Sequence, residues 1–583
     1  MAGAMPKDTM PLTRDCLTQR LPRTADLTAG LLVLAAEAFY FRNILGSPLL
    51  LGDTGDGHFC LLVAEHWYRW LLGKEGFFTL PIFYPETNAL AWSDLLLGFG
   101  LPHALLRLIG LDPYQAYKTT LLGLHAAGSL GTFLLLRKGL GLGSASAFMG
   151  AVFAGSSQLI VPSCHTQLYA CAFLPFLAWA LLAFFRNLDG PRLPRISAGC
   201  AAVGLMALLV YTSFYAACFA ALFLGGLALL DAVRCAAIPR HRPQGRRLLS
   251  FFHPKEHLAE TALYAALAVL LLAPFVALEL PARRSFGGRE WNVVVSYLPT
   301  LPGLLNVHAS NLLFGWIQRA AGLSRHHELT IGWIPTTAVL FLATAVLLAK
   351  RRIQALLRPA PDQPDADQQA ERETLFLLLA LSTLLATFAG CKTAEGHSPW
   401  RLIHAFVPGM DAMRAVSRIH VFLTFPAALT CAFGAERFLK MVPHRVVRAI
   451  AALVLCALAA LSCTWKNGVH AKWSADWARK VLQAVPAPPE GCALIAVEDS
   501  GKRPAFRHPF EYQLAAWEIA NRWDRPTLNG YSGQAPMGWT MNGAMGRTLR
   551  PKTELWIQRH GLNDVCIYDW GTNTWRMASS RRQ

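Results

Sequence analysis

The feature that most constrains this chain is a series of eleven apolar runs, each about 17 to 25 residues long. A run of this length crosses the hydrocarbon core of a bilayer as a helix. Charged residues make up only 15% of the chain, whereas soluble domains carry about 25%. The sequence therefore predicts an all-α polytopic membrane protein. The runs lie at 28–47, 114–136, 143–161, 166–186, 196–212, 214–233, 258–279, 332–350, 374–390, 417–437 and 447–464.

The Lys and Arg residues between these runs predict the orientation. They gather in every second connection, whereas connections 162–165 and 212–213 carry none. Because basic loops stay in the cytoplasm, we expect a cytoplasmic N-terminus and an exoplasmic C-terminus. The net charge of +18 then reflects topology, and no nucleic-acid partner is expected.

The chain is predicted to have three parts. A cytoplasmic tail covers 1–27, a transmembrane domain covers 28–464, and a small exoplasmic α/β domain covers 465–583. The transmembrane domain includes a first exoplasmic loop, 48–113, and a large exoplasmic loop, 280–331.

The first exoplasmic loop is predicted to stay on one side of the membrane. Its two helical segments, 58–72 and 92–110, are interpreted as interfacial helices. The first has an apolar side, with Glu65 and Arg69 on the other side. Treating 92–110 as a crossing would move every later basic loop to the outside, against the charge pattern.

The C-terminal domain shows short alternating signals for strands and helices. We expect a buried strand over 492–497 and an amphipathic helix over 511–523. A second helix should begin near Glu554 and stop at Gly561, before a strand that ends near Tyr568.

Cysteine and histidine patterns predict neither a metal site nor a disulfide framework. The thirteen cysteines are scattered and none forms a CxxC pair. The histidines of His326-His327-Glu328 are adjacent and should point apart, so no zinc site is expected. Glu37 and His125 lie inside apolar runs; we expect Glu37 to pair with Arg42 and His125 to be hydrogen-bonded within the bundle.

Two carboxylates, Asp53 and Asp56, follow the first apolar run on a glycine-rich turn. Being three residues apart, they can share one face, and the glycines let the backbone approach a substrate. Asp56 could instead cap the helix that begins after it, but a single helix needs one cap. We therefore expect chemistry at this turn, with Asp53 the preferred residue.

Five short motifs accompany this topology: Gly52-Asp-x-x-Asp56, Phe83-Tyr-Pro85, His165-x-Gln-Leu168, Met413-Arg-Ala-x-x-Arg418 and Leu528-Asn-Gly-Tyr-Ser532. The topology resembles the GT-C superfamily of membrane glycosyltransferases, and the motifs resemble more narrowly its large bacterial members akin to those that glycosylate lipoteichoic acid. The superfamily-like module covers about 28–280, and a looser pattern continues to 532.

The resemblance implies a polyprenyl-phosphate sugar donor, a glycan, lipid or protein acceptor, and the bacterial inner membrane, with the C-terminal domain on the periplasmic or extracellular side. The first-loop acid of the superfamily acts as general base or orients the acceptor, which implies Asp53 first and Asp56 second. Its oligosaccharyltransferase branch also binds a divalent metal through acids in the second exoplasmic loop. That loop offers His165 and no acid here, so a Mg or Mn site at Asp53, Asp56 and His165 stays open.

Sugar transfer from a lipid phosphate needs a base near the acceptor hydroxyl and cations beside the departing phosphate. Arginine suits the second task because its fork pairs two phosphate oxygens. Arg414 and Arg418 are four residues apart where the tenth run begins, so both should face one pocket, although such residues also contact lipid headgroups. The candidates for binding the lipid phosphate or the substrate are His165, Arg283, Arg284, Arg289, His397, Arg401, Arg414 and Arg418.

The sequence therefore favours a membrane glycosyltransferase that transfers a hexosyl or pentosyl group on the exoplasmic face. Two alternatives stay open. A flippase or transporter of lipid-linked saccharides would carry ionisable or broken helices at the bilayer midplane. A polymerase or ligase of the O-antigen type would centre its chemistry on late-loop residues such as Arg414 and His397.

Overall fold

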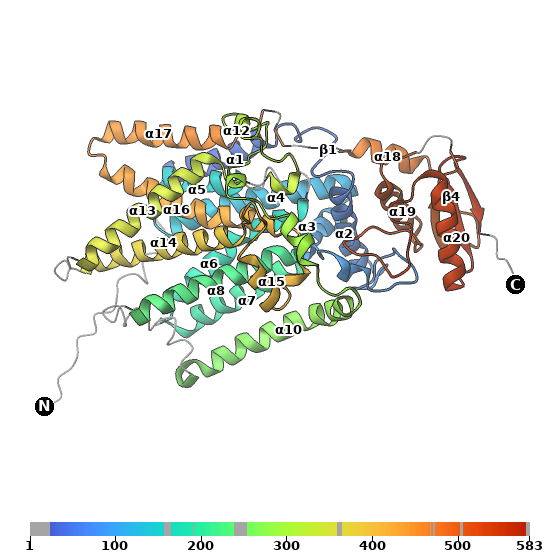
Figure 1. The fold of residues 1–583 in the computed structure, drawn as a ribbon, viewed down its shortest axis with the longest axis horizontal. Coiled ribbons are helices and arrows are strands. Elements are labelled where there is room, and N and C mark those ends of the chain that lie inside the picture. The colour runs from blue at the N-terminus through green and yellow to red at the C-terminus, as the bar shows by residue number, and fades with distance from the viewer. Residues whose placement is uncertain are drawn as a thin grey trace.

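The structure, a computed structural model, places a long helical bundle beside a smaller C-terminal domain (Figure 1). The N-terminal tail up to residue 23 and the start of the second exoplasmic loop lie outside the described residues. The structure describes residues 24–578 except 157–164, 189, 238–253, 331, 358–363, 467, 470, 472 and 502–504.

A helix occupies each of the eleven predicted runs. Eight of the described helices are long and apolar enough to cross a membrane, and α1, α5 and α13 are not among them. The class of a mostly α polytopic membrane protein is confirmed, while eleven crossings stay a prediction. The helices at the predicted runs are α1 (Thr24–Tyr40), α4 (Pro113–Leu134), α5 (Ser144–Ser156), α6 (Leu174–Arg186), α7 (Arg192–Thr212), α8 (Phe214–Ala237), α10 (Pro254–Phe286), α13 (Pro335–Leu357), α14 (Pro364–Ala389), α16 (Ile419–Met441) and α17 (Arg445–Ser462).

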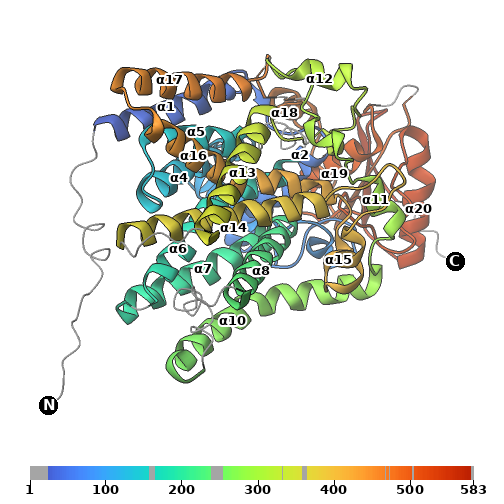
Figure 2. The same cartoon turned by 60° about the vertical axis from the view of Figure 1, so that its left-hand side comes forward.

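Helix α16 forms the centre of the bundle, and almost all of its side chains are buried. It packs against α5, α13 and α14. Close packing depends on small residues: a Cβ added at Gly434 of α16 would lie 1.9 Å from Oγ1 of Thr344 in α13. Helices α10 and α17 lie at the edge of the bundle in both views (Figures 1 and 2) and expose most of their apolar side chains.

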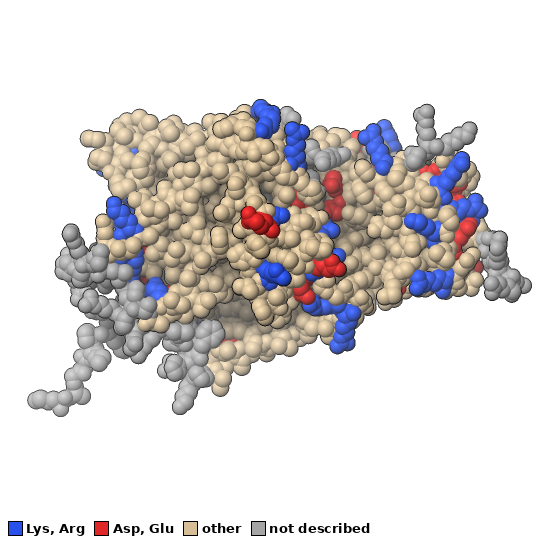
Figure 3. Space-filling view, viewed as in Figure 1, with Lys and Arg blue, Asp and Glu red and all other residues tan. Residues whose placement is uncertain are grey.

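Charged side chains are sparse over the helices and gather over the middle and the C-terminal end on the face shown in Figure 3. Inside the bundle, Glu37 of α1 contacts Nδ1 of His125 in α4. The pairing expected between Glu37 and Arg42 is wrong, because Arg42 donates instead to the carbonyl oxygens of Trp465 and Lys466, both at 2.9 Å. His125 is hydrogen-bonded within the bundle, as predicted.

Of the two helices in the first loop, α2 (Asp56–Leu71) is buried rather than interfacial and packs against α3 (Leu97–Leu108). Helix α3 exposes the apolar side chains of Leu101, Leu105 and Leu108, as expected of an interfacial helix. Glu65, expected on a solvent-facing side, is buried and lies 2.9 Å from His103 and 3.0 Å from Arg107, both in α3. Arg69 is likewise buried against Glu75. Because its charged side chains are paired, α2 can be enclosed on all sides. The position of Glu65 and Arg69 opposite its apolar side therefore does not mark a solvent-facing side.

The C-terminal domain has the predicted α/β character. Strand β3 (Leu494–Glu498) pairs in parallel with β4 (Val565–Asp569), which pairs antiparallel with β5 (Thr574–Met577). Helices α18 (Ala475–Gln483), α19 (Pro509–Trp523) and α20 (Leu549–His560) accompany the sheet, and α20 ends at Gly561, whose φ is +60°. These elements confirm the strands and helices expected there, except that α20 begins at Leu549 rather than near Glu554.

A disulfide joins Cys492 to Cys566, beside and within the two parallel strands. The expectation that the cysteines form no disulfide is therefore wrong for this pair, which lies 74 residues apart in the chain. Residues this distant carry no pairing signal in one sequence. Nine other cysteines among the described residues are free.

The C-terminal domain packs directly on the first loop. Strand β1 (Leu49–Leu50) pairs antiparallel with β2 (Trp473–Ser474). His58 of α2 contacts the carboxylate of Glu518 in α19. The indole N–H of Trp556 donates to the carbonyl of Tyr84 at 2.8 Å. The loop that carries the two candidate acids is thus held between the bundle and this domain.

Candidate functional site

The acid turn runs from Gly52 to Gly57 and is too tight for side chains at its two ends. Gly52 has a φ of +92°, and a Cβ added there would lie 2.6 Å from Cα of Gly57. Oδ1 of Asp53 accepts hydrogen bonds from the N–H groups of Gly55 (3.1 Å) and Gly57 (3.2 Å). The capping role considered for Asp56 is therefore filled by Asp53.

Asp56 is the first residue of α2 and uses both carboxylate oxygens outside its own helix. Oδ2 lies 2.7 Å from Nδ1 of His165, and Oδ1 accepts a 2.8 Å hydrogen bond from the hydroxyl of Tyr531. His165 directly precedes the short helix η4 (Thr166–Phe173), and Tyr531 belongs to the C-terminal domain. Three distant parts of the chain thus meet at one carboxylate.

His165 continues this contact into a buried ion pair. Its Nε2 lies 3.2 Å from Oε1 of Glu328. Arg418 donates to Glu328 through Nη2 at 2.6 Å and through Nε at 3.3 Å, and its guanidinium carbon lies 5.1 Å from the ring centre of Tyr215. We call Asp56, His165, Glu328 and Arg418 the charged cluster; its charges alternate in sign, which offsets the cost of burial.

The electrostatics separate the two acids of the turn. Burial and the neighbouring charge of Asp56 raise the pKa of Asp53. Burial acts to raise the pKa of Asp56, but the hydrogen bond and charge of His165 outweigh it and lower that pKa to about 2. Burial and Arg418 act to lower the pKa of His165, yet its bonds to Asp56 and Glu328 raise it above the usual value. Asp56 is thus held as an anion, while the raised pKa values mean that His165 and Asp53 each bind a proton more readily than usual.

Two arginines at and just after the end of α10 both contact Asp411. Arg283, at the end of α10, pairs with Asp411 at 2.5 Å. Arg289 donates through Nη2 to the carbonyl of Gly533 at 3.1 Å and through its backbone N–H to the carbonyl of Asp411 at 2.7 Å. Burial and the charge of Arg414 lower the pKa of Arg289. Two cations therefore approach each other here.

Arg414 and Arg418 do not share a helical face, because residues 413–415 lie between two short 3₁₀ turns. Arg418 is buried in the charged cluster. Arg414 is exposed, with its guanidinium carbon 5.3 Å from the ring centre of Tyr297. Tyr215 links the two, since its hydroxyl accepts from the N–H of Arg414 at 3.0 Å while its ring lies against Arg418.

The other candidates lie apart from the charged cluster. Arg284, His397 and Arg401 are exposed, and no contact between described residues joins them to Asp56 or Glu328. The N–H of His397 donates to Oγ1 of its neighbour Thr393 at 3.2 Å. These three residues were candidates only because they lie in predicted exoplasmic loops. Such a position does not determine where a side chain points.

Three residues of the site were missed from sequence. In the sequence, Glu328 stands out only because it follows the adjacent histidines His326 and His327. Tyr531 stands out only as part of a turn motif. Asp94 had no signal at all; it accepts from the N–H of Phe214 at 2.9 Å, burial raises its pKa to about 6, and it is near enough to interact with the charges of Arg418 and Asp56. Only tertiary contacts reveal these residues.

The residues do not fit the metal site left open from sequence. Mg²⁺ and Mn²⁺ require several free oxygen ligands, whereas both oxygens of Asp56 and both nitrogens of His165 already face other side chains. Among the described residues, no group of three or more His, Cys, Asp or Glu side chains is arranged to hold a metal ion. No step below uses one.

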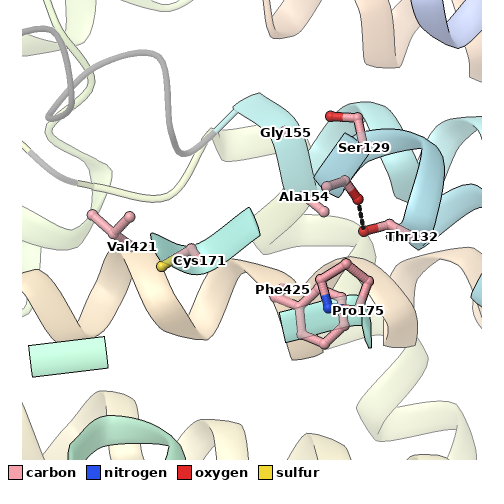
Figure 4. Close-up of a pocket in the computed structure, with 9 residues that line it drawn as sticks. Ser129, Thr132, Ala154, Gly155, Cys171, Pro175, Val421 and Phe425 are labelled. Atoms are coloured by element: carbon pink, nitrogen blue, oxygen red, sulfur yellow. Dashed lines mark hydrogen bonds between the residues drawn. The ribbon is translucent and has the colours of Figure 1, made fainter. Parts of the chain in front are cut away.

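A small cavity lies elsewhere, between α4, α5, α6 and α16 (Figure 4). Its lining includes Ser129, Thr132, Cys171 and Phe425 but no carboxylate, imidazole or cationic group. Thr132 donates to the carbonyl of Gly128 at 2.9 Å and so has its own partner. This cavity lies among membrane-spanning helices and does not belong to the candidate site.

No family model and no curated protein matches the chain. Among solved structures, it is similar to the oligosaccharyltransferase AglB from Archaeoglobus fulgidus, solved with an inhibitory peptide and a dolichol-phosphate. The identity is 11% and the TM-score 0.48, over 95% of this chain and 74% of that chain. It is also similar to the arabinofuranosyltransferase AftD from Mycobacteria, at 15% identity and TM-score 0.47, over 89% of this chain and 34% of that one.

Both of these proteins belong to the GT-C superfamily. That superfamily is also the one that the sequence motifs resemble. At these identities and TM-scores, the chemistry of this chain is argued from its own residues.

Proposed function

We propose that this protein is a membrane glycosyltransferase that moves a sugar from a polyprenyl phosphate to an acceptor hydroxyl on the exoplasmic face. The observation that carries the proposal is the pair of acids at the turn. Asp53 has a raised pKa, while Asp56 is held as an anion by His165 and Tyr531. Environments that push the pKa values of two neighbouring acids apart are typical of catalytic sites.

Asp53 is the proposed general base. Its Oδ1 is engaged with the backbone, so Oδ2 is the oxygen that takes the proton from the acceptor hydroxyl. As the proton moves, the hydroxyl oxygen bonds to the anomeric carbon, and the bond from that carbon to the phosphate oxygen breaks with its electron pair on the phosphate. Direct attack of this kind inverts the anomeric configuration. Asp56 orients the acceptor, because its low pKa makes it a poor base.

Arg289 and Arg414 are the proposed phosphate ligands. Arg283 and Arg418 have carboxylate partners, Asp411 and Glu328. By contrast, no ion pair with a described carboxylate involves Arg289 or Arg414. Two adjacent cations without anionic partners favour an anion between them, and Tyr215 ties Arg414 to the charged cluster.

The test uses the full chain in proteoliposomes with radiolabelled polyprenyl-phosphate hexose or pentose and a mixture of envelope glycans. We expect wild-type transfer and its loss in Asp53→Asn, while Asp56→Asn should raise the acceptor KM. Full transfer in both variants would remove the proposed base.

The two alternative functions give other outcomes in the same preparation. A flippase would move the lipid-linked sugar across the vesicle without forming a product. A polymerase or ligase of the O-antigen type would lose activity in Arg414→Ala and His397→Ala and keep it in both Asp variants. The exposed position of His397, away from the acid turn, counts against that outcome.

A further inference from the structure

Three aromatic side chains of the C-terminal domain line the approach to the acid turn. We call His508, Phe510 and Tyr531 the aromatic strip. The rings of His508 and Phe510 are nearly parallel, at 6°, with centroids 5.1 Å apart, and the centroids of Phe510 and Tyr531 are 5.8 Å apart. His508 is exposed and the other two are partly exposed.

The strip directly adjoins the proposed base. A Cβ added at Gly55 would lie 3.3 Å from Cε2 of Phe510 and 3.6 Å from Oδ1 of Asp53, so the ring and the carboxylate border the same point. Tyr531 itself donates to Asp56. Phe510 and Tyr531 therefore border Asp53 and Asp56, respectively.

The strip is also held in place. Oε2 of Glu511 accepts from the N–H groups of Arg507 (2.8 Å) and His508 (2.9 Å), which fixes the start of α19. Aromatic rings that are exposed yet fixed cost little conformational entropy when they bind a ligand. Core packing does not account for the arrangement of the three rings, because the ring of His508 at the end of the strip is exposed.

We propose that the aromatic strip is an acceptor subsite that binds the ring of a sugar. This inference rests on the proposed function and narrows the acceptor to a carbohydrate. The C–H groups on one face of a sugar ring are weakly positive and suit the negative face of aromatic rings. The hydroxyls project from the rim of the sugar, where Asp53 and Asp56 can accept their hydrogen bonds. A protein or a lipid tail offers no such combination of flat C–H face and hydroxyl rim.

Binding can be measured without turnover. The full chain in nanodiscs, without donor, is mixed with methyl α-D-mannopyranoside, methyl β-D-galactopyranoside or methyl α-D-arabinofuranoside, and saturation-transfer NMR reports the sugar protons that touch the protein. We expect contacts on the ring C–H groups of at least one glycoside. Phe510→Ala and His508→Ala should each weaken the signal severalfold, and Phe510→Trp should keep it.

Trp316→Ala is the matched control, because Trp316 is an exposed aromatic residue, at 58%, in α12 (Gly315–Ala320); its signal should equal the wild type. Equal signals in wild type, Phe510→Ala and His508→Ala would overturn the subsite, as would the lack of any glycoside contact in the wild type. Because His508 is the N-cap residue of α19, the circular dichroism of His508→Ala must equal that of the wild type for its weaker signal to count.

Transfer assays complete the test. Phe510→Ala should raise the acceptor KM up to about tenfold with kcat little changed. A raised KM for the lipid-linked donor, with the acceptor KM unchanged, would assign the strip to lipid and overturn the inference. If glycosides bind through the strip but no donor supports transfer, the proposed function fails while the carbohydrate site stands.

Discussion

Two histidine–carboxylate pairs in this chain use the same chemical groups in different surroundings. Glu37 and His125 lie inside the bundle, with side chains 8% and 0% exposed. Asp56 and His165 lie at the acid turn, with side chains 32% and 8% exposed. The inner pair ends at the carbonyl of Gly155, 3.2 Å from Nε2 of His125. The outer pair continues through Glu328 to Arg418 and lies beside a second acid, Asp53, so only the outer pair adjoins the proposed base.

The largest difference between the two pairs should appear in catalysis. Asp53→Asn, beside the outer pair, should reduce kcat by about 10² to 10⁴, the usual contribution of a general base. The amide oxygen of Asn can still accept from the N–H groups that Asp53 now caps, so the fold should persist. Glu37→Gln should leave kcat within about twofold of wild type. Transfer rates and circular dichroism of both variants check this, and equal losses in kcat would contradict the comparison.

Stability should show the next largest effect. Glu328→Gln leaves Arg418 buried without its charged partner, which should cost about 3–5 kcal/mol. Glu37→Gln should cost about 1–3 kcal/mol, as for one disrupted buried hydrogen bond. Thermal unfolding in one detergent gives both values. A larger loss of stability in Glu37→Gln would reverse the ranking.

The pH dependence sharpens the assignment of Asp53 and Asp56. A base must be unprotonated, so kcat/KM should fall on the acid side at a pH above 3.8, since the pKa of Asp53 is raised from that value. The pH profile of Glu37→Gln should keep the same limb. The ordinary pKa of Glu differs from that of Asp. If kcat/KM falls at the same acid pH in Asp53→Glu, another group is responsible for the fall.

The pairing of Asp56 with His165 gives stability a pH window. The pKa of Asp56 is lowered, so its contribution is complete above 3.8 and is lost as the pH falls toward 2. The pKa of His165 is raised, so its contribution is complete below 6.5 and is lost as the pH rises through the higher folded value. The difference in melting temperature between wild type and His165→Gln should be largest between pH 3.8 and 6.5. A difference that grows at higher pH would contradict the ion pair.

The smallest expected effect separates two exposed arginines. Arg414→Ala should raise the KM for the lipid-phosphate donor about tenfold, the value of one charge-assisted hydrogen bond. Arg284→Ala, matched in charge and exposure, should change it less than about twofold. Donor titrations of both variants are the measurement, and equal KM values would remove Arg414 from the phosphate site.

The fold was largely accessible from the sequence, because apolar run length and turn chemistry are local properties. Helices lie at all eleven runs, and β3, α19 and the stop of α20 at Gly561 were expected. The burial of α2 was not expected. It depends on His103, Arg107 and Asp524, which are distant in the chain and neutralise the charges of α2. Charge along a helix predicts a solvated face only when no partner is supplied from elsewhere.

The site was only partly accessible. The acid turn was found because glycines and carboxylates adjoin the first run, and His165 because it lies in a short connection between two runs. The capping role weighed for Asp56 is filled by Asp53, whose carboxylate accepts from two N–H groups of the turn. The pairing of His165 with Glu328, and of Asp56 with Tyr531, joins residues 163 and 475 positions apart, beyond the reach of any local pattern.

The most direct test of the central claim is mass spectrometry of cell-envelope glycans from a strain that lacks this protein. The strain is complemented in turn with wild type, Asp53→Asn and Glu37→Gln, each at matched membrane levels. We expect one sugar to be missing in the deletion and in Asp53→Asn, and to be restored by wild type and by Glu37→Gln. Restoration of that sugar by Asp53→Asn would contradict the account.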